Sequence, residues 1–225
     1  MNPRIALMLL FAVGLGASGC SREKEVVFWL RKAPQQFTGI SADAAEALTE
    51  REQGWAPVQR YESWEEWVRD GRRITGCEAV LLRLCKEPAS PFSRWFIVQA
   101  LGFVGSQKSV PLLLTILSDE NETTQTRSSA AGALGRIGVS EVVQPLVELN
   151  RRLKWSGNPS EEEYLDESDE TQLKFSVLLG LGMIDDPRVR PVLEAEIQDA
   201  RADPWRKKCL LEVLANPRPE ADFSR

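Results

Sequence analysis

The heptapeptide GALGRIG, from Gly132 to Gly138, is the stretch that decides the fold. Its three glycines, spaced three residues apart, approach the pattern that binds a pyrophosphate in dinucleotide-binding proteins. A site of that kind needs an apolar strand before the glycines and a helix after them. The preceding residues TTQTRSSAA, 123–131, are small and compatible with a helix, so the glycines are predicted to end a helix instead. We therefore interpret them as architecture and not as a nucleotide site.

Similar segments occur on both sides of this stretch. RWFIVQALGFVG (94–105), RSSAAGALGRIG (127–138) and KFSVLLGLGMID (174–185) place apolar residues and glycines at matching positions. Each is followed by a segment with a proline in what should be the first turn of a second helix: Pro111, Pro145 and Pro191. Each unit thus predicts two helices joined by a tight turn, and repetition of such units predicts a solenoid.

These motifs resemble a known repeat family. ALGRIG followed by a proline-bearing helix, and GMIDDPRVRPVLEAEI (182–197), are similar to HEAT repeats, and more narrowly to the short HEAT-like repeats of phycobilisome lyases. The resemblance implies an all-α fold, an α-solenoid of about four helical hairpins. A further hairpin is predicted around Trp64, Trp67 and Cys77–Glu87, and a final helix at Pro204–Ala215.

The N-terminus, MNPRIALMLLFAVGLGASGC, resembles a bacterial lipoprotein signal. Arg4 precedes an apolar run that is too short to span a bilayer comfortably, and small residues stand before Cys20. The resemblance implies cleavage before Cys20 and lipidation of that cysteine, and Ser21 matches the pattern of outer-membrane sorting. Ala17 departs from the leucine usual in such signals, so the alternative is a secretory signal cleaved after Gly19.

These features predict three segments. Residues 1–19 form a signal peptide, residues 20–60 a lipidated N-terminus and tether with one helix from about Ala42, and residues 61–225 the solenoid, with an acidic insertion around 155–170. The predicted location is the bacterial cell envelope, where the lipid-anchored chain faces the periplasm from the outer membrane. The membrane is then one partner, through the lipid anchor.

The composition argues against several classes of function. The chain contains no histidine, which removes the commonest general base and metal ligand. Its net charge of −5 and the lack of a basic face argue against nucleic-acid binding. We therefore predict no catalytic residue, no metal, no cofactor and no small-molecule substrate.

Cys77 and Cys85 would lie about 12 Å apart on one helix, too far for a disulfide. Buried free thiols are predicted, with one disulfide in the periplasm as the alternative.

The acidic insertion is the main departure from the repeat. Its aromatic residues Trp155 and Tyr164 lie in a polar loop beside the solenoid groove, which suits partner recognition. The alternative is that both fold back onto a neighbouring hairpin. The acidic residues lack the ordered spacing of a calcium loop, so a solvated loop is predicted. Exposed candidates on the groove lined by second helices are Lys108, Thr115, Glu141, Glu148, Arg152, Arg188 and Glu194.

The resulting hypothesis is a membrane-anchored, periplasm-facing scaffold or adaptor that binds another envelope protein. Its predicted partner-binding residues are Trp155, Tyr164, Arg152, Glu148 and Arg188. This function follows from what HEAT arrays usually do and not from a chemical site. Two alternatives belong to other classes: an enzyme or chromophore-handling protein related to the bilin lyases, and a passive structural spacer.

Overall fold

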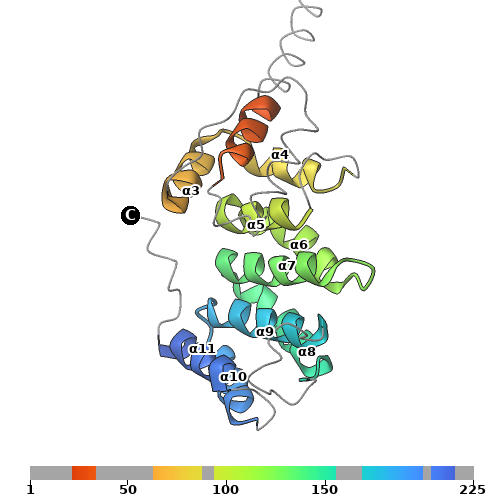
Figure 1. Ribbon diagram of the computed structural model, residues 1–225, viewed down its shortest axis with the longest axis vertical. Coiled ribbons are helices and arrows are strands. Elements are labelled where there is room, and N and C mark those ends of the chain that lie inside the picture. Colours follow the sequence, from red (N-terminus) through yellow and green to blue (C-terminus); the bar gives the residue numbers. More distant parts are fainter. Residues whose placement is uncertain (1–21, 34–62, 88–93, 156–168, 200–203, 216–225) are drawn as a thin grey trace, which may run out of the picture. The chain divides into compact units, whose positions relative to one another are not determined.

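The computed structural model describes residues 22–33, 63–87, 94–155, 169–199 and 204–215. The chain divides into two compact units, an N-terminal unit of residues 1–83 and a repeat unit of residues 84–225. Within the described ranges every regular element is a helix (Figure 1), which confirms the predicted all-α class. None of these described helices combines the length and apolar character needed to cross a bilayer.

In the repeat unit, first helices alternate with second helices. The bounds are α5 (Arg94–Val104), α6 (Val110–Ser118), α7 (Thr124–Ile137), α8 (Val143–Arg152), α9 (Asp169–Gly182), α10 (Val189–Gln198) and α11 (Pro204–Ala215), with short 3₁₀ turns η2 (Gln107–Ser109) and η3 (Ser140–Val142). The first helices α5, α7, α9 and α11 pack on one another in order, as Figure 1 shows. The second helices pack against the same row. This arrangement is the predicted α-solenoid of HEAT-like hairpins.

The aligned apolar positions form the core of the repeat unit. The side chains at these positions in α5, α7 and α9 are completely buried: Val98, Leu101, Ala131, Leu134, Leu178 and Leu181. Burying one large aliphatic side chain stabilises the fold by about 1.5–3 kcal/mol, so this row accounts for much of the packing energy. The prolines lie in the first turns of α6, α8 and α10, where a missing N–H leaves no helical hydrogen bond unmade.

The three glycines of GALGRIG have three different surroundings. Gly135 faces α9, and a Cβ there would overlap the Gly180 carbonyl oxygen and lie 2.7 Å from the Gly180 Cα. Gly138 ends α7 with φ of +70°, and its N–H donates to the Leu134 carbonyl oxygen at 3.1 Å. At Gly132 a Cβ would meet only the flexible end of Arg136, at 3.4 Å. Gly138 therefore ends the helix as predicted, whereas Gly132 and Gly135 lie inside α7, where Gly135 permits the close approach of α9.

Alanine substitution should change the free energy of unfolding in opposite directions at two of these glycines. We expect Gly135→Ala to lower the free energy of unfolding by about 1–3 kcal/mol, because the new Cβ meets backbone atoms that cannot rotate away. Gly132→Ala in the same helix should instead raise it by about 0.5–1 kcal/mol, because alanine favours a helix interior over glycine. Urea denaturation of both variants measures the difference. Equal responses would contradict the close approach of α7 to α9.

The N-terminal unit contains a helix at residues 22–31, α3 (Trp64–Arg73) and α4 (Cys77–Leu84). Trp29 of the first helix stacks on Trp67 of α3, with ring centroids 4.4 Å apart and an interplanar angle of 8°. The Trp29 indole N–H donates to the Trp67 carbonyl oxygen at 2.6 Å, and the Trp67 indole N–H donates to the Trp29 carbonyl oxygen at 3.0 Å. Gly71 gives the Trp29 ring its space, because a Cβ there would overlap the indole.

This helix departs from the predicted tether at residues 20–60. Over residues 22–33 the chain is folded, because apolar residues at helical spacing give it one buried face: Val26, Trp29, Leu30 and Ala33. Sequence reasoning missed the helix because it repeats nothing elsewhere in the chain. The helix predicted from about Ala42 lies outside the described residues.

The described cysteines outside the N-terminus are free thiols. Cys77 and Cys85 are buried and Cys209 is partly buried. Burial raises the pKa of Cys77 to about 12, and the nearby charges of Glu25 and Glu78 act in the same direction. Burial also raises the pKa of Cys85. Both thiols therefore stay protonated and poorly nucleophilic near neutral pH, as expected of cysteines that serve packing.

Candidate partner-binding surface

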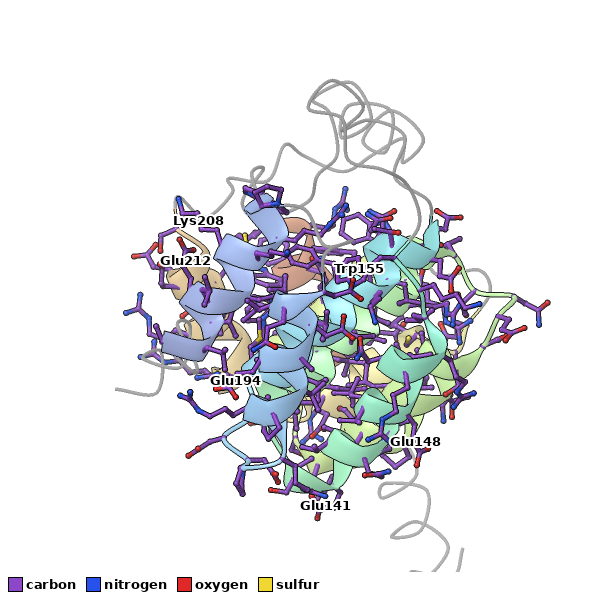
Figure 2. All side chains as sticks on the ribbon, turned by 90° about the horizontal axis from the view of Figure 1, so that it is seen from below. Glu141, Glu148, Trp155, Glu194, Lys208 and Glu212 are labelled. Atoms are coloured by element: carbon purple, nitrogen blue, oxygen red, sulfur yellow. The ribbon has the colours of Figure 1, made fainter. Side chains whose placement is uncertain are left out.

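The second helices and the turns before them expose a polar surface. All seven predicted groove residues are exposed: Lys108, Thr115, Glu141, Glu148, Arg152, Arg188 and Glu194. Figure 2 shows Glu141, Glu148 and Glu194 on the outside of the unit. Behind them, the apolar residues of the same helices are buried, as Leu113, Leu146 and Leu193 show. A partner can therefore contact the outer residues without disturbing the core.

Some of these exposed side chains form hydrogen bonds with other residues of the same chain. The Arg188 guanidinium donates to both carboxylate oxygens of Asp186, at 2.8 and 2.7 Å, and to the Ser140 carbonyl oxygen at 2.9 Å. These bonds tie the turn before α10 to the turn before α8. Hydrogen bonds from Arg188 hold the pKa of the Asp186 carboxyl well below its usual range. Arg188 thus orders neighbouring turns, and its contact with a partner stays a prediction.

Helix α8 contributes Glu148 and Arg152 to this surface. Glu148 accepts a hydrogen bond from Gln144 Nε2 at 2.9 Å, one turn earlier on the same helix. Exposed pairs of this kind contribute little to stability, so a partner can replace the contact at small cost. Arg152, also exposed, is the last residue of α8 and stands directly before the insertion. Glu148 and Arg152 therefore remain candidate contact residues on α8.

Trp155 has the position that the alternative interpretation described. Its side chain is only 6% exposed, and its indole N–H donates to Glu196 Oε2 at 2.8 Å. The ammonium of Lys174 and the guanidinium of Arg206 lie 5.4 and 5.3 Å from its ring centroid. The prediction of Trp155 as an exposed recognition residue is therefore wrong, because it folds back onto α9, α10 and α11. Tyr164 lies outside the described residues.

Trp155 belongs to a buried polar cluster that we define as Asn150, Trp155, Lys174 and Glu196. The Lys174 ammonium donates to the Asn150 carbonyl oxygen at 3.1 Å, to Asn150 Oδ1 at 3.0 Å and to Glu196 Oε1 at 2.8 Å. Asn150 Nδ2 also donates to Glu196 Oε1, at 2.8 Å. All three protons of the ammonium thus have acceptors, which allows Lys174 to be only 4% exposed. The cluster joins α8, α9 and α10.

Sequence reasoning did not identify this cluster, although one signal was present. Lys174 lies four residues before the core residue Leu178, so both side chains share one face of α9. A lysine on a core face predicts a buried partner, because an unpaired buried charge is costly. Its partners Asn150 and Glu196 belong to other helices, and no local pattern points to them.

The described residues on either side of the insertion are held together. The Lys154 backbone N–H donates to Glu170 Oε1 at 2.9 Å, and Glu170 lies in the first turn of α9. Its negative charge there is also favourable to the helix dipole. Together with Trp155 in the polar cluster, this bond holds the described residues on the two sides of 156–168. Within the ranges that the structure describes, no group of His, Cys, Asp and Glu side chains could hold a metal ion.

The comparisons with known proteins agree with this architecture. No curated protein matches the sequence significantly. The family model for HEAT repeats matches residues 78–153, which extend from the start of α4 to the end of α8. The matched segment includes the GALGRIG stretch and the hairpin of α7 and α8. Residues 78–153 are therefore HEAT repeats, and this match covers less than half of the chain.

Proposed function

We propose that this protein is a lipid-anchored scaffold of the bacterial cell envelope that binds another envelope protein. The observation that supports this function best is the row of exposed polar residues on α6, α8 and α10, whose opposite faces are buried. Such a row is a contact surface on a rigid support, which is how solenoids present binding faces. HEAT repeats commonly act as interaction scaffolds and typically are not enzymes.

The anchor and the location rest on the N-terminal sequence. The apolar segment and the small residues before Cys20 support lipidation of that cysteine. We accordingly place the repeat unit on the periplasmic side of the outer membrane. Lipid chains on Cys20 would give firm attachment, because each buried methylene contributes about 0.8 kcal/mol.

The insertion suggests the chemistry of the partner. Residues 156–168 contain five acidic side chains and no basic one, together with Tyr164. Insertions in repeat arrays emerge on one face, which is often the binding face. Here the junction that closes the insertion directly follows Arg152, at the end of the exposed surface of α8. We infer that α8 and the insertion together bind a basic protein surface.

Replacing residues 157–167 with a short Gly-Ser linker should abolish partner capture without unfolding the protein. The design retains Trp155, Asp169 and Glu170, so the polar cluster and the Lys154 hydrogen bond remain. Shortening a loop changes closure entropy only slowly with length, which is why folding should persist. The measurement is capture from envelope extract, with captured proteins identified by mass spectrometry. Wild-type capture of a basic partner should also weaken as salt rises.

A matched control separates charge from length. A variant that keeps the insertion but changes Glu161, Glu162 and Glu163 to glutamine should lose most of the salt dependence. Circular dichroism checks that both variants retain the helix content of the wild type. Full capture of every partner by the linker variant would show that the insertion is not the recognition element. Arg152→Glu would then test the α8 surface alone.

A further inference from the structure

The helix at residues 22–31 has an exposed face whose composition differs from that of the whole chain. Lys24 and Phe28 lie four residues apart on this helix and are exposed, and the partly exposed Lys32 follows in the turn directly after it, so the three form one stripe. Phe28 is 47% exposed, although it is a large apolar side chain. The Lys32 ammonium lies 4.6 Å from the centroid of the Phe28 ring. The stripe thus combines an exposed aromatic ring with ammonium groups.

The opposite face of this helix is fixed. Val26, Trp29 and Leu30 are buried, and the reciprocal Trp29–Trp67 hydrogen bonds hold the helix against α3. The helix therefore cannot rotate to hide Phe28 without breaking the stacked tryptophan pair. The outward direction of the stripe is a fixed property of the N-terminal unit.

The charge of the helix favours an anionic surface. Residues 22–31 contain three basic and two acidic side chains, and Lys32 follows directly, so residues 22–32 have a net charge of +2, whereas the whole chain has −5. Of the two acids, Glu23 is paired with Arg83 at 2.6 Å. Lysine and phenylalanine are among the residue types that bind membrane interfaces, and here they stand beside one another on the face that does not pack against α3. Lysine side chains there extend their methylenes along apolar groups and keep the ammonium among the headgroups.

The position of the helix in the chain brings this face to a membrane. The helix begins at Arg22, two residues after Cys20. Two fully extended residues reach about 7 Å, which is close to the thickness of one headgroup layer, about 5–8 Å. An acylated Cys20 would therefore hold the start of this helix at the headgroups.

We propose that Lys24, Phe28 and Lys32 contact the surface of the membrane that holds the anchor. Phe28 enters the interface, and the two ammonium groups bind the phosphates of anionic lipids. The contact rests on the proposed acylation of Cys20 and adds a second attachment to it. The N-terminal unit then lies directly on the bilayer and does not swing on a tether.

Thiol labelling of the acylated full-length protein in preformed vesicles tests this contact. Phe28→Cys provides the reporter, and Leu211→Cys on α11 is the matched control, because Leu211 has a similar exposed fraction of 54%. The vesicles contain phosphatidylethanolamine and phosphatidylglycerol, and the reagent is a maleimide that cannot cross membranes. Labelling of the wild-type protein supplies the background from its own cysteines. Intact mass first establishes whether Cys20 carries acyl groups.

We expect the Phe28→Cys thiol to react about tenfold more slowly than the Leu211→Cys thiol, since each lysine near an anionic surface adds to the attraction. Adding Lys24→Glu and Lys32→Glu should return the two rates to near equality. Equal rates in the acylated protein without the charge reversals would overturn the membrane contact alone. Shielding that requires added envelope extract would overturn it in favour of a protein partner. An unmodified Cys20 would overturn both the anchor and the contact.

Discussion

Replacing Lys174 by methionine is expected to lower the free energy of unfolding by about 3–5 kcal/mol. Methionine preserves the approximate length of the side chain but removes the ammonium. Glu196 would then keep its charge in a nearly buried site, and the Asn150 carbonyl oxygen would lose its donor. Breaking a buried pair on one side is costly, because Glu196 would keep only the neutral donors of Asn150 and Trp155 and would lose the positive charge that balances its own. Urea denaturation followed by circular dichroism measures the loss.

The same substitution at an exposed lysine is the matched control. Lys154→Met changes the side chain of a residue that takes part in the junction through its backbone N–H, so the effect should stay within about 0.5 kcal/mol. A double variant, Lys174→Met with Glu196→Leu, removes both charges of the pair. It should be destabilised by less than the sum of the two single variants, because the groups are in contact. Equal, small effects of Lys174→Met and Lys154→Met would contradict the buried cluster.

The cluster also explains how the repeat accommodates its insertion. Trp155 is the last described residue before residues 156–168, and Glu170 lies in the first turn of α9. The Trp155–Glu196 and Lys154–Glu170 hydrogen bonds fix these two ends independently of what lies between them. The acidic sequence of residues 156–168 can therefore change without loss of the α8–α9 packing. This separation is what a recognition loop on a stable scaffold requires.

The repeated core was predictable from the sequence because one pattern specifies it several times. Leu101, Leu134 and Leu181 recur at the same place relative to a glycine, so each repeat supports the interpretation of the others. All three are completely buried, as the alignment requires. A single glycine-rich segment would have left the nucleotide interpretation open. Repetition resolved it, because a phosphate-binding loop has no reason to recur with a proline-bearing helix after each copy.

The features that sequence reasoning missed depend on partners far away in the chain. Trp29 meets Trp67 across 38 residues, and Trp155 meets Glu196 across 41 residues. Local composition described residues 20–60 as a tether and Trp155 as part of a polar loop. For Trp155 the alternative of folding back onto a neighbouring hairpin was the correct one, because an aromatic residue buries a large apolar area wherever packing allows. Neither contact belongs to the repeat, so the alignment could not reveal them.

Replacing Leu134 by alanine is expected to lower the free energy of unfolding by about 2–5 kcal/mol. Leu134 is completely buried in α7, which packs against α5, α6 and α9. A cavity at this position removes contacts on both sides of the central hairpin. Neighbouring repeats stabilise one another through their shared interfaces, so weakening the middle one affects the whole repeat unit. Thermal and urea denaturation should both register the change.

Two controls show that the effect comes from burial. Leu211→Ala makes the same chemical change on α11 at a side chain that is 54% exposed, and Glu148→Ala truncates an exposed residue of the proposed binding surface. Both should change the free energy of unfolding by less than about 0.5 kcal/mol. Equal tolerance at Leu134 and Leu211 would contradict the solenoid core. Because Glu148→Ala should leave the fold intact, any loss of partner capture by that variant would report on the α8 surface and not on stability.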